Sequence, residues 1–508
     1  MTSRTSSIFR KAARGVSSRL FDFAYDNARR IAPLRRRIDD RIETMLEPAM
    51  SGLRPYRDQP TFSALPETGV PRGDVLRLID ALAARERPHW AEGNASGAVY
   101  RGDAEHLEFQ NQVYARCAQS NPLHTDIWPS ASKFEAEVVA MCARLLGAAS
   151  MEPREESERI SGTVTSGGTE SIILAMKAYR DLAWSSHRRA RRQILAPESA
   201  HAAFDKAAQL LGLELVRVPV GSDYRADLGS MRRAIGPQTL VVVASAPCFP
   251  HGVVDPVAEI AKLAAEHDVG LHVDACLGGF VLPFARDLGF AVSEFDFRVP
   301  GVTSMSIDTH KYGYAAKGTS VILYRGAELC RQQYFVSTEW SGGLYFSPTL
   351  AGSRPGGLSA ACWASLVSIG RDGYLGCTRR ILETAAVIRR GIEAIPDLYV
   401  LGDPLWVIAF ASRTLDIYRV HEEMGKRGFS LNGLQHPAAV HLCVTLPHTE
   451  PGAAERFLRE LRAAVEAVRA LPADKQGTAP VYGMATTFPA RGAVAELLRR
   501  YVERLYRP

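Results

Sequence analysis

Short apolar runs alternate with amphipathic segments after residue 150, and this alternation predicts a mainly parallel sheet with helices between its strands. The apolar runs that we predict to be strands cover residues 160–164, 193–196, 214–219, 240–246, 270–273, 302–307 and 319–324. Helical periodicity covers residues 170–184, 202–211 and 257–267, among others. The predicted fold class is therefore α/β.

The pattern changes near residue 371. Two further apolar runs, at 406–411 and 440–446, lie among helical segments and predict a smaller C-terminal α+β domain. We expect three parts: a basic helical segment over residues 1–95, a large domain over 96–370 and a small domain over 371–508.

The first 60 residues carry the whole charge excess of the chain. They hold 13 Lys and Arg against 7 Asp and Glu, and the net charge of the 508 residues is +6. Because the remainder is balanced, the sequence argues against a broad nucleic-acid surface. The eight cysteines are scattered without a CxxC pair, and neither a membrane span nor a secretory signal is apparent. We therefore expect a cytoplasmic protein.

An apolar stripe runs through this basic segment, formed by Ile31, Leu34, Ile38, Ile42 and Met45 at helical spacing. One interpretation is an amphipathic helix in residues 1–50 that makes peripheral contact with an anionic membrane. The other is a helix that packs its stripe on a partner subunit, with the arginines in solvent. We favour the second interpretation because interfacial anchors are less common than packed amphipathic helices.

Lys311 is the first candidate for chemistry, in a short polar segment between the runs 302–307 and 319–324. A lysine at the end of a buried strand is poorly solvated, and we expect this to lower its pKa. A neutral amine can form a Schiff base with an aldehyde, which is how proteins hold pyridoxal phosphate.

Two further segments match what this cofactor requires. The loop 166–171 follows an apolar run and opens a helix, so Gly168 and Thr169 could donate amides to a phosphate. A plain strand-to-helix turn with Thr169 as the N-cap is the alternative. Asp274 ends another apolar run, where a carboxylate could keep a ring nitrogen protonated. It could equally be a surface turn residue.

His201 begins a helical segment and could stack on the cofactor ring and transfer protons, or simply cap the helix. A second polar set suits an anionic substrate group such as a phosphate, although each member could also be structural. This set comprises Tyr100, Asn121, His124, Lys317 and the loop at Ser353 and Arg354.

Several long motifs, taken in order, resemble the sphingosine-1-phosphate lyases of the group II pyridoxal-phosphate-dependent decarboxylase superfamily. They are SGAVY at 96–100, NPLH at 121–124, VTSGGTES at 164–171, SAHAAFDKA at 199–207, FPHGVVDPV at 249–257, LHVDACLGGF at 271–280, DTHKYGYAAKG at 308–318 and AGSRPGGLSAACWA at 351–364. The resemblance implies a fold-type I, transferase-like enzyme with a seven-stranded sheet and helices on both faces. It also implies a homodimer whose active sites are shared between subunits.

The resemblance also implies roles for the candidate residues. Lys311 would form the Schiff base, Asp274 would pair with the ring nitrogen and His201 would stack on the ring. The cofactor phosphate would be held by Gly168, Thr169 and His310, with Ser353 reaching in from the partner. The substrate phosphate would be held by Tyr100, Asn121, His124 and Lys317, of which Tyr100 and Lys317 would also be catalytic. No metal is expected.

The implied reaction cleaves the C2–C3 bond of a phosphorylated sphingoid base into a long-chain aldehyde and phosphoethanolamine. Lys311, Lys317, His201 and a phosphate oxygen all remain candidates for the proton carrier. Two positions depart from the family pattern, with Ile307 where an alanine is usual and Ala316 where a proline is common.

Two other functions remain open at this stage. A group II amino-acid decarboxylase would use the same lysine, aspartate and histidine but would release carbon dioxide. A non-catalytic, membrane-associated binding protein would account for the basic N-terminus, but it would not require Lys311, Asp274 and His201 together.

Overall fold

The computed structural model describes residues 25, 27, 29–53, 56, 58–148, 158–470 and 491–507. The chain forms two compact units, one of Met1–Trp90, Ala411–Val440 and Glu460–Pro508, and the other of Ala91–Phe410 and His441–Arg459. Every candidate site residue belongs to the second unit. The three-part division of the sequence remains a prediction.

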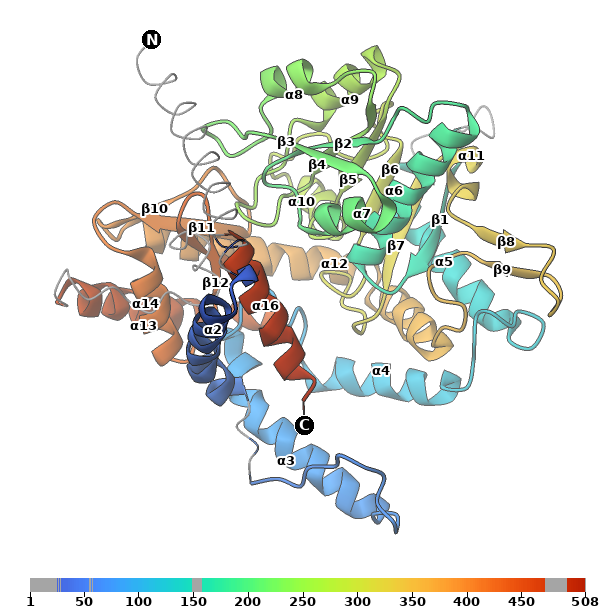
Figure 1. Cartoon of the computed structure of the whole chain (residues 1–508). Helices are drawn as coiled ribbons and strands as arrows, with labels where there is room; N and C mark the ends of the chain where they lie inside the picture. Colours follow the sequence, from blue (N-terminus) through green and yellow to red (C-terminus); the bar gives the residue numbers. More distant parts are fainter. Residues whose placement is uncertain are drawn as a thin grey trace. The chain divides into compact units, whose positions relative to one another are not determined.

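The main sheet has seven strands in the order β1-β7-β6-β5-β4-β2-β3 (Figure 1). Its strands are β1 Ile160–Thr165, β2 Gln193–Pro197, β3 Glu214–Val218, β4 Thr239–Ser245, β5 Gly270–Asp274, β6 Ser304–Ile307 and β7 Ser320–Arg325. β7 pairs antiparallel with both β1 and β6, and the other pairs are parallel. The predicted mainly parallel α/β sheet is confirmed.

Helices cover both faces of this sheet, as predicted. The chain moves outward from β2 to β3 and then back through β4 to β5. Parallel crossovers are right-handed, so crossovers that run in opposite directions along the sheet place their helices on opposite faces. The helix between β2 and β3, α7, therefore covers one face, and the helices on the way back to β5, α8 and α9, cover the other. The helices around the sheet are α6 Gly168–Ser185, α7 Ala203–Leu211, α8 Leu228–Ala234, α9 Val257–Glu266, α10 Leu282–Asp287 and α11 Ala327–Arg331.

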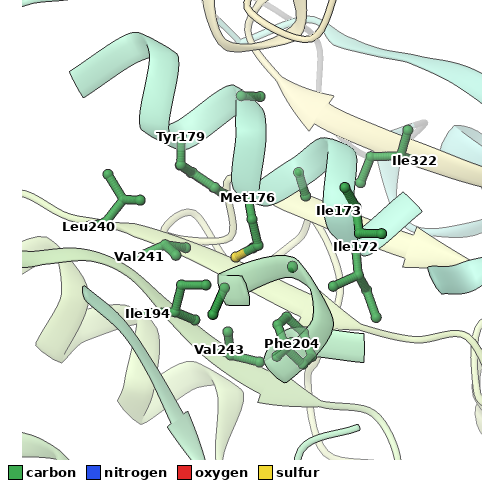
Figure 2. Close-up of a cluster of buried hydrophobic side chains, with 14 of the residues drawn as sticks. Ile172, Ile173, Met176, Tyr179, Ile194, Phe204, Leu240, Val241, Val243 and Ile322 are labelled. Atoms are coloured by element: carbon green, nitrogen blue, oxygen red, sulfur yellow. The ribbon is translucent and has the colours of Figure 1, made fainter. Parts of the chain in front are cut away.

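The core between α6, α7 and the sheet is apolar and closely packed. Figure 2 shows its members Ile172, Ile173, Met176 and Tyr179 of α6, Phe204 of α7, and Ile194, Leu240, Val241, Val243 and Ile322 of the strands. Burial of each large aliphatic side chain contributes roughly 1.5–3 kcal/mol. This packing fixes α6, and therefore the loop that precedes it, against the ends of the strands.

The remaining elements include a second, smaller sheet of four strands in the order β10-β11-β13-β12, which confirms the predicted C-terminal α+β region. Its strands are β10 Leu398–Val400, β11 Val407–Ser412, β12 Asn432–Leu434 and β13 Ala439–Cys443, and β8 Phe335–Ser337 pairs with β9 Tyr345–Ser347. The other helices are α3 Arg72–Trp90, α4 Ala104–Cys117, α5 Pro129–Leu145, α12 Gly356–Glu393, α13 Ile417–Lys426 and α14 Ala453–Arg469, with 3₁₀ turns η1 Ala91–Gly93 and η3 Leu446–Thr449. A break at Gly370, where φ is 61°, interrupts α12 beside the predicted domain boundary.

The predicted N-terminal helix is present as α2, Ala32–Leu53, and it packs on α16, Arg491–Leu505, of the same chain. Ile42 and Leu46 of α2 are buried against Leu497, whereas Ile31 and Leu34 are exposed. The side chain of Met45 lies outside the described residues. Part of the apolar stripe therefore serves an intrachain contact that the sequence did not predict.

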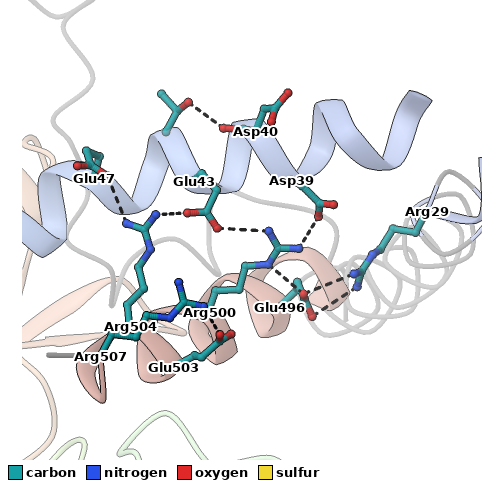
Figure 3. A network of polar contacts seen from close by, with 11 residues as sticks. Arg29, Asp39, Asp40, Glu43, Glu47, Glu496, Arg500, Glu503, Arg504 and Arg507 are labelled. Carbon is teal, nitrogen blue, oxygen red and sulfur yellow. Dashed lines mark hydrogen bonds and ion pairs between the residues drawn. The ribbon is translucent and has the colours of Figure 1, made fainter. Parts of the chain in front are cut away.

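Ion pairs reinforce this helix pair (Figure 3). Arg500 of α16 contacts Asp39 and Glu43 of α2, and Arg504 contacts Glu43 and Glu47. Acidic residues of α2 thus face arginines of α16. Within the described parts of the chain, no helix combines the length and the apolar character needed to cross a bilayer.

Candidate active site

The loop that precedes α6 is held in place by one buried carboxylate. Glu170 Oε2 accepts hydrogen bonds from the backbone N of Ser166 at 2.7 Å and from its Oγ at 2.6 Å, and Oε1 accepts from the backbone N of Leu350 at 3.0 Å. The N-cap of α6 is Gly167, so the alternative of Thr169 as the N-cap is wrong. Gly168 and Thr169 instead lie in the first helical turn, whose amides lack intrahelical partners.

Gly168 is packed so closely that any side chain would collide with its neighbours. A Cβ atom there would lie 2.8 Å from Asp308 Oδ1 and 2.8 Å from the sulfur of Cys276. Asp308 Oδ1 is buried and has no hydrogen-bond partner among the described residues. The glycine thus lets the loop backbone pack against these side chains, while the amides of the first turn of α6 remain available to hold a small anionic ligand.

Lys311 makes an ion pair that the sequence analysis missed. Its Nζ lies 2.8 Å from Oδ2 of Asp308, and Asp308 is 2% exposed. Burial is the largest single effect on the pKa of Lys311 and lowers it, as we predicted, but the charge and hydrogen bond of Asp308, together with Cys276 and Tyr100, raise that pKa above its ordinary value. The predicted lowering of the Lys311 pKa is therefore wrong, because the sequence analysis did not include the neighbouring charge.

Asp274 ends β5 beside Ser306 of β6, its partner in the parallel register. The side chain is buried, and its Oδ1 accepts hydrogen bonds from the backbone N of Cys276 at 3.1 Å and from the Ser306 hydroxyl at 3.3 Å. The carboxylate is thus held by donors at a strand end, and it is not an exposed turn residue.

Six of the predicted cofactor residues line one cavity of about 400 Å³, namely Gly168, Thr169, His201, Asp274, His310 and Lys311. His201 Nδ1 accepts a hydrogen bond from the backbone N of Ala203 at 3.1 Å, and its ring meets Phe249 edge to face at 6.1 Å. His310 Nδ1 donates to the carbonyl of Thr319 at 2.5 Å. Burial lowers the pKa of His310, although the charge of Asp308 opposes this.

Comparison with known proteins identifies the family to which the chain that forms this cavity belongs. The model of the pyridoxal-dependent decarboxylase conserved domain matches residues 100–409. The sphingosine-1-phosphate lyase of Dictyostelium discoideum is 45% identical, over 87% of this chain and 82% of its own length, and that of Rattus norvegicus is 44% identical, over 88% and 78%. The solved sphingosine-1-phosphate lyase of Burkholderia pseudomallei is 44% identical with a TM-score of 0.80, covering 82% of this chain and 95% of that one.

The chain belongs to the sphingosine-1-phosphate lyase family. Members of this family are pyridoxal-phosphate-dependent lyases, so the predicted family, enzyme class and cofactor are confirmed. A glutamate decarboxylase from Lactobacillus brevis, 19% identical with a TM-score of 0.68 over 82% of this chain and 97% of its own, shows the same fold.

The side chains of the cavity fit the cofactor of this lyase family. Lys311 supplies an amine and Asp274 supplies a carboxylate at a strand end. Gly168 supplies a cradle that a Cβ atom would fill. When bound, pyridoxal phosphate withdraws electrons from a substrate bond through its protonated ring nitrogen.

The predicted substrate residues of this lyase divide into two sets. Lys317 Nζ lies 4.6 Å from the centre of the buried Tyr100 ring and 3.5 Å from the carbonyl of His310. The Lys317 side chain is exposed, but protein atoms around its amine exclude part of the water, and this desolvation lowers the pKa of Lys317 to about 8. The charge of Lys311 also lowers this pKa, and the charge of Asp308 opposes the change. This amine therefore changes charge near neutral pH.

The other members of the set make contacts away from this pair. Asn121 Oδ1 accepts from the backbone N of Leu123 at 3.0 Å and of Arg354 at 3.1 Å. His124 is exposed, with its ring 6.3 Å from that of Trp128. Ser353 is exposed, next to Arg354, whose guanidinium pairs with Glu135 at 2.6 and 3.0 Å. Their assignment to substrate or cofactor stays a prediction.

The structure adds residues that sequence reasoning did not select. Asp308 is three residues before Lys311, and Glu170 is two residues after Gly168. An acid three residues before Lys311, or one at a helix start, was visible in the sequence, but acids on the surface show the same spacing. Only burial and distance separate the two cases.

Proposed function

We propose that this protein cleaves the C2–C3 bond of phosphorylated sphingoid bases, releasing a long-chain aldehyde and phosphoethanolamine. The proposal rests on about 45% identity to sphingosine-1-phosphate lyases across most of the chain, together with a cavity that unites Lys311, Asp274 and Gly168. When bound, pyridoxal phosphate would supply the electron sink for this cleavage.

The side chains have separate roles in this proposal. Lys311 Nζ would hold the cofactor through its amine, and the Asp274 carboxylate would pair with the ring nitrogen. The amides of Gly168 and Thr169 and the ring of His310 hold the cofactor phosphate, while His201 covers the ring. Positioning of this kind is the main source of rate acceleration available to a preformed site.

Lys317 and Tyr100 are proposed to act on the substrate. Burial raises the pKa of Tyr100, so its phenol stays protonated and can donate a hydrogen bond. Below pH 8, Lys317 carries a positive charge that suits the substrate phosphate. As a neutral amine, Lys317 could instead accept the proton that leaves the C3 hydroxyl. Within one chain Asn121 and His124 make their contacts away from this pair, so their predicted contacts to the substrate phosphate would require the shared active site of the dimer.

Quaternary structure and location also belong to this proposal. We infer a homodimer in which the partner's copy of Ser353 reaches the cofactor phosphate, since Ser353 is exposed and does not line the cavity of its own chain. We infer cytoplasmic residence because all eight cysteines are free thiols. Peripheral membrane contact through residues 1–50 is a further hypothesis, and residues 1–24 lie outside the described structure.

A product assay tests the function directly. The cofactor-loaded enzyme is incubated with a phosphorylated sphingoid base, and with amino acids in parallel, while long-chain aldehyde and carbon dioxide are measured. We expect aldehyde only from the phosphorylated base, and Lys311→Ala should abolish both turnover and the visible absorption of the bound cofactor. Carbon dioxide from an amino acid without aldehyde would identify a decarboxylase, and the absence of both products would favour a binding protein.

A further inference from the structure

A continuous chain of buried hydrogen bonds crosses the core and ends on Asp274. The Tyr179 hydroxyl lies 2.7 Å from Ser304 Oγ, which lies 2.8 Å from Nδ1 of His272. Nε2 of His272 lies 3.4 Å from Ser306 Oγ, which donates to Asp274 Oδ1 at 3.3 Å. His272 and both serines are fully buried, and Tyr179 and Asp274 are at most 9% exposed.

The sheet register explains why these side chains meet. His272 pairs with Ser304, and Asp274 pairs with Ser306, across the parallel strands β5 and β6. Alternate residues of a strand share one face, so all four side chains lie on the same face. Helix α6 covers that face and brings Tyr179 to it, as Figure 2 shows for the α6 side of the sheet.

Burial keeps the two rings in this series of hydrogen bonds, His272 and Tyr179, in their neutral forms. It lowers the pKa of His272 to about 4, although the charge of Asp274 opposes this. It raises the pKa of Tyr179 to about 12, against hydrogen bonds from Ser304 and Thr303. Near pH 7, His272 therefore carries one N–H and Tyr179 keeps its hydroxyl proton.

The charge of Asp274 then sets the direction of every hydrogen bond in the chain. A carboxylate can only accept, so the single hydroxyl proton of Ser306 is given to Asp274. The Ser306 oxygen must then accept from Nε2–H of His272, which leaves Nδ1 to accept from Ser304. Ser304 in turn accepts from Tyr179.

We propose that His272 is a positioning residue, which by donating to Ser306 holds Oδ1 of Asp274 as an acceptor and presents Oδ2 to the ring nitrogen of the cofactor. This inference rests on the proposed role of Asp274. Among the described residues, Oδ2 has no hydrogen-bond partner, and the Asp274 side chain lines the cofactor cavity. Hydrogen-bond donation to a carboxylate stabilises its charged form.

A purely structural role would predict a different outcome. In that case the chain would only satisfy polar groups in the core, and cutting it would lower stability without changing the cofactor. A positioning role requires the protonation of the ring nitrogen to change as well. The ¹⁵N chemical shift of ring-labelled pyridoxal phosphate in the reconstituted holoenzyme separates the two roles.

His272→Phe removes both ring nitrogens while keeping an aromatic ring against Phe204, whose ring lies 5.8 Å away. We expect its ¹⁵N signal to move toward the unprotonated value, with kcat lowered about tenfold and KM little changed. His272→Gln should retain the wild-type signal, because its amide can accept from Ser304 and donate to Ser306. A folded His272→Phe holoenzyme with a wild-type signal would overturn the inference.

Ser306→Ala cuts the last hydrogen bond with a smaller change in volume, and it serves if His272→Phe does not fold. It should move the signal in the same direction, and an unchanged signal would overturn the inference. Tyr324→Phe is the matched control, because Tyr324 is fully buried and its hydroxyl donates to Gln333 at 2.7 Å. This hydrogen bond does not belong to the series that links Tyr179 to Asp274. Tyr324→Phe should lower stability and leave the ¹⁵N signal unchanged. If it moved the signal as far as His272→Phe does, loss of any buried hydrogen bond would account for the change, and the positioning role would be overturned.

Asp274→Asn separates this inference from the proposed function. If Asp274→Asn moves the signal and His272→Phe does not, the positioning role fails and the proposed role of Asp274 stands. If neither variant moves the signal, Asp274 does not face the ring nitrogen, and the site assignment fails as well.

Discussion

Replacing Asp308 by asparagine should reverse the direction in which the protein shifts the pKa of Lys311. In the structure, the amine and the Asp308 carboxylate are 2.8 Å apart, and Asp308 is 2% exposed. Burial alone lowers the pKa of Lys311, and Asp308, the largest of the opposing neighbours, helps to raise it above its ordinary value of 10.5. Without that charge, only the effect of burial and of weaker neighbours remains.

The size of the effect follows from the geometry. Two unit charges 2.8 Å apart attract by about 6 kcal/mol at an effective dielectric constant of about 20. Because an unpaired amine can release its proton, the loss of stability should be smaller than this. We expect the cofactor-free Asp308→Asn variant to lose about 3–5 kcal/mol of unfolding free energy at pH 6.

The way in which stability depends on pH follows from the direction of the Lys311 pKa shift. In the wild type, the raised pKa of Lys311 contributes stability that is complete below pH 10.5 and disappears as the pH rises through the higher folded-state value. In Asp308→Asn, a folded-state pKa below 10.5 makes stability increase as the pH rises toward 10.5. The deficit of the variant relative to wild type should therefore narrow between pH 6 and pH 10.

Urea unfolding at several pH values measures this deficit, and a double-mutant cycle with Lys311→Met isolates the coupling of the pair. Asp255→Asn is a suitable control, because Asp255 is fully buried and accepts from the backbone N of Ala226 and of Ser245, each at 2.8 Å. Burial raises the pKa of Asp255 to about 6, so the deficit of its variant should stay constant above pH 7. A constant deficit for Asp308→Asn from pH 6 to pH 10 would refute the reasoning.

Three other variants test separate parts of the molecule. Because Lys317 loses its charge above pH 8, the KM for the phosphorylated base should rise there, and Lys317→Arg should remove that rise. If the variant and the wild type showed the same pH profile of KM, Lys317 would not bind the substrate phosphate. Gly168→Ala places a Cβ 2.8 Å from Asp308 and Cys276, so cofactor affinity measured by fluorescence titration should fall about tenfold or more, and unchanged affinity would show that the loop does not hold the cofactor. Replacing the exposed Ile31 and Leu34 by serine should weaken the proposed homodimer in sedimentation equilibrium, and an unchanged dissociation constant would argue against their contact with a partner.

Much of the main sheet could be predicted from the sequence. Strands buried on both faces, such as β4, are continuous apolar runs, and the helices between them keep a regular apolar stripe. The strands β8, β9, β10 and β12 were not predicted. Each has three residues, which is too short for a pattern to emerge, and each depends on a partner strand for its hydrogen bonds.

The N-terminal helix was predicted correctly as an element, but the contact made by its apolar stripe was not. Amphipathicity indicates that one side of a helix is covered, and it does not indicate by what. The buried contact of Ile42 and Leu46 is with α16, more than 400 residues away along the chain. Membrane, partner subunit and own chain all require the same spacing of apolar residues.

The sequence by itself determined the family, the fold class and the residue types of the cofactor site. Lys311, Asp274 and the Gly168 loop each lie at the end of a locally encoded strand, and parallel strands place such ends at one edge of the sheet. Only the tertiary structure decided how these groups are charged and oriented. The Asp308 carboxylate sets the charge of Lys311, and the pairing of β5 with β6 places His272 and Ser306 behind Asp274. Charge and hydrogen-bond direction depend on burial and on distances of a few ångströms, both for the near neighbours Asp308 and Lys311 and across the paired strands, and local patterns do not encode those distances.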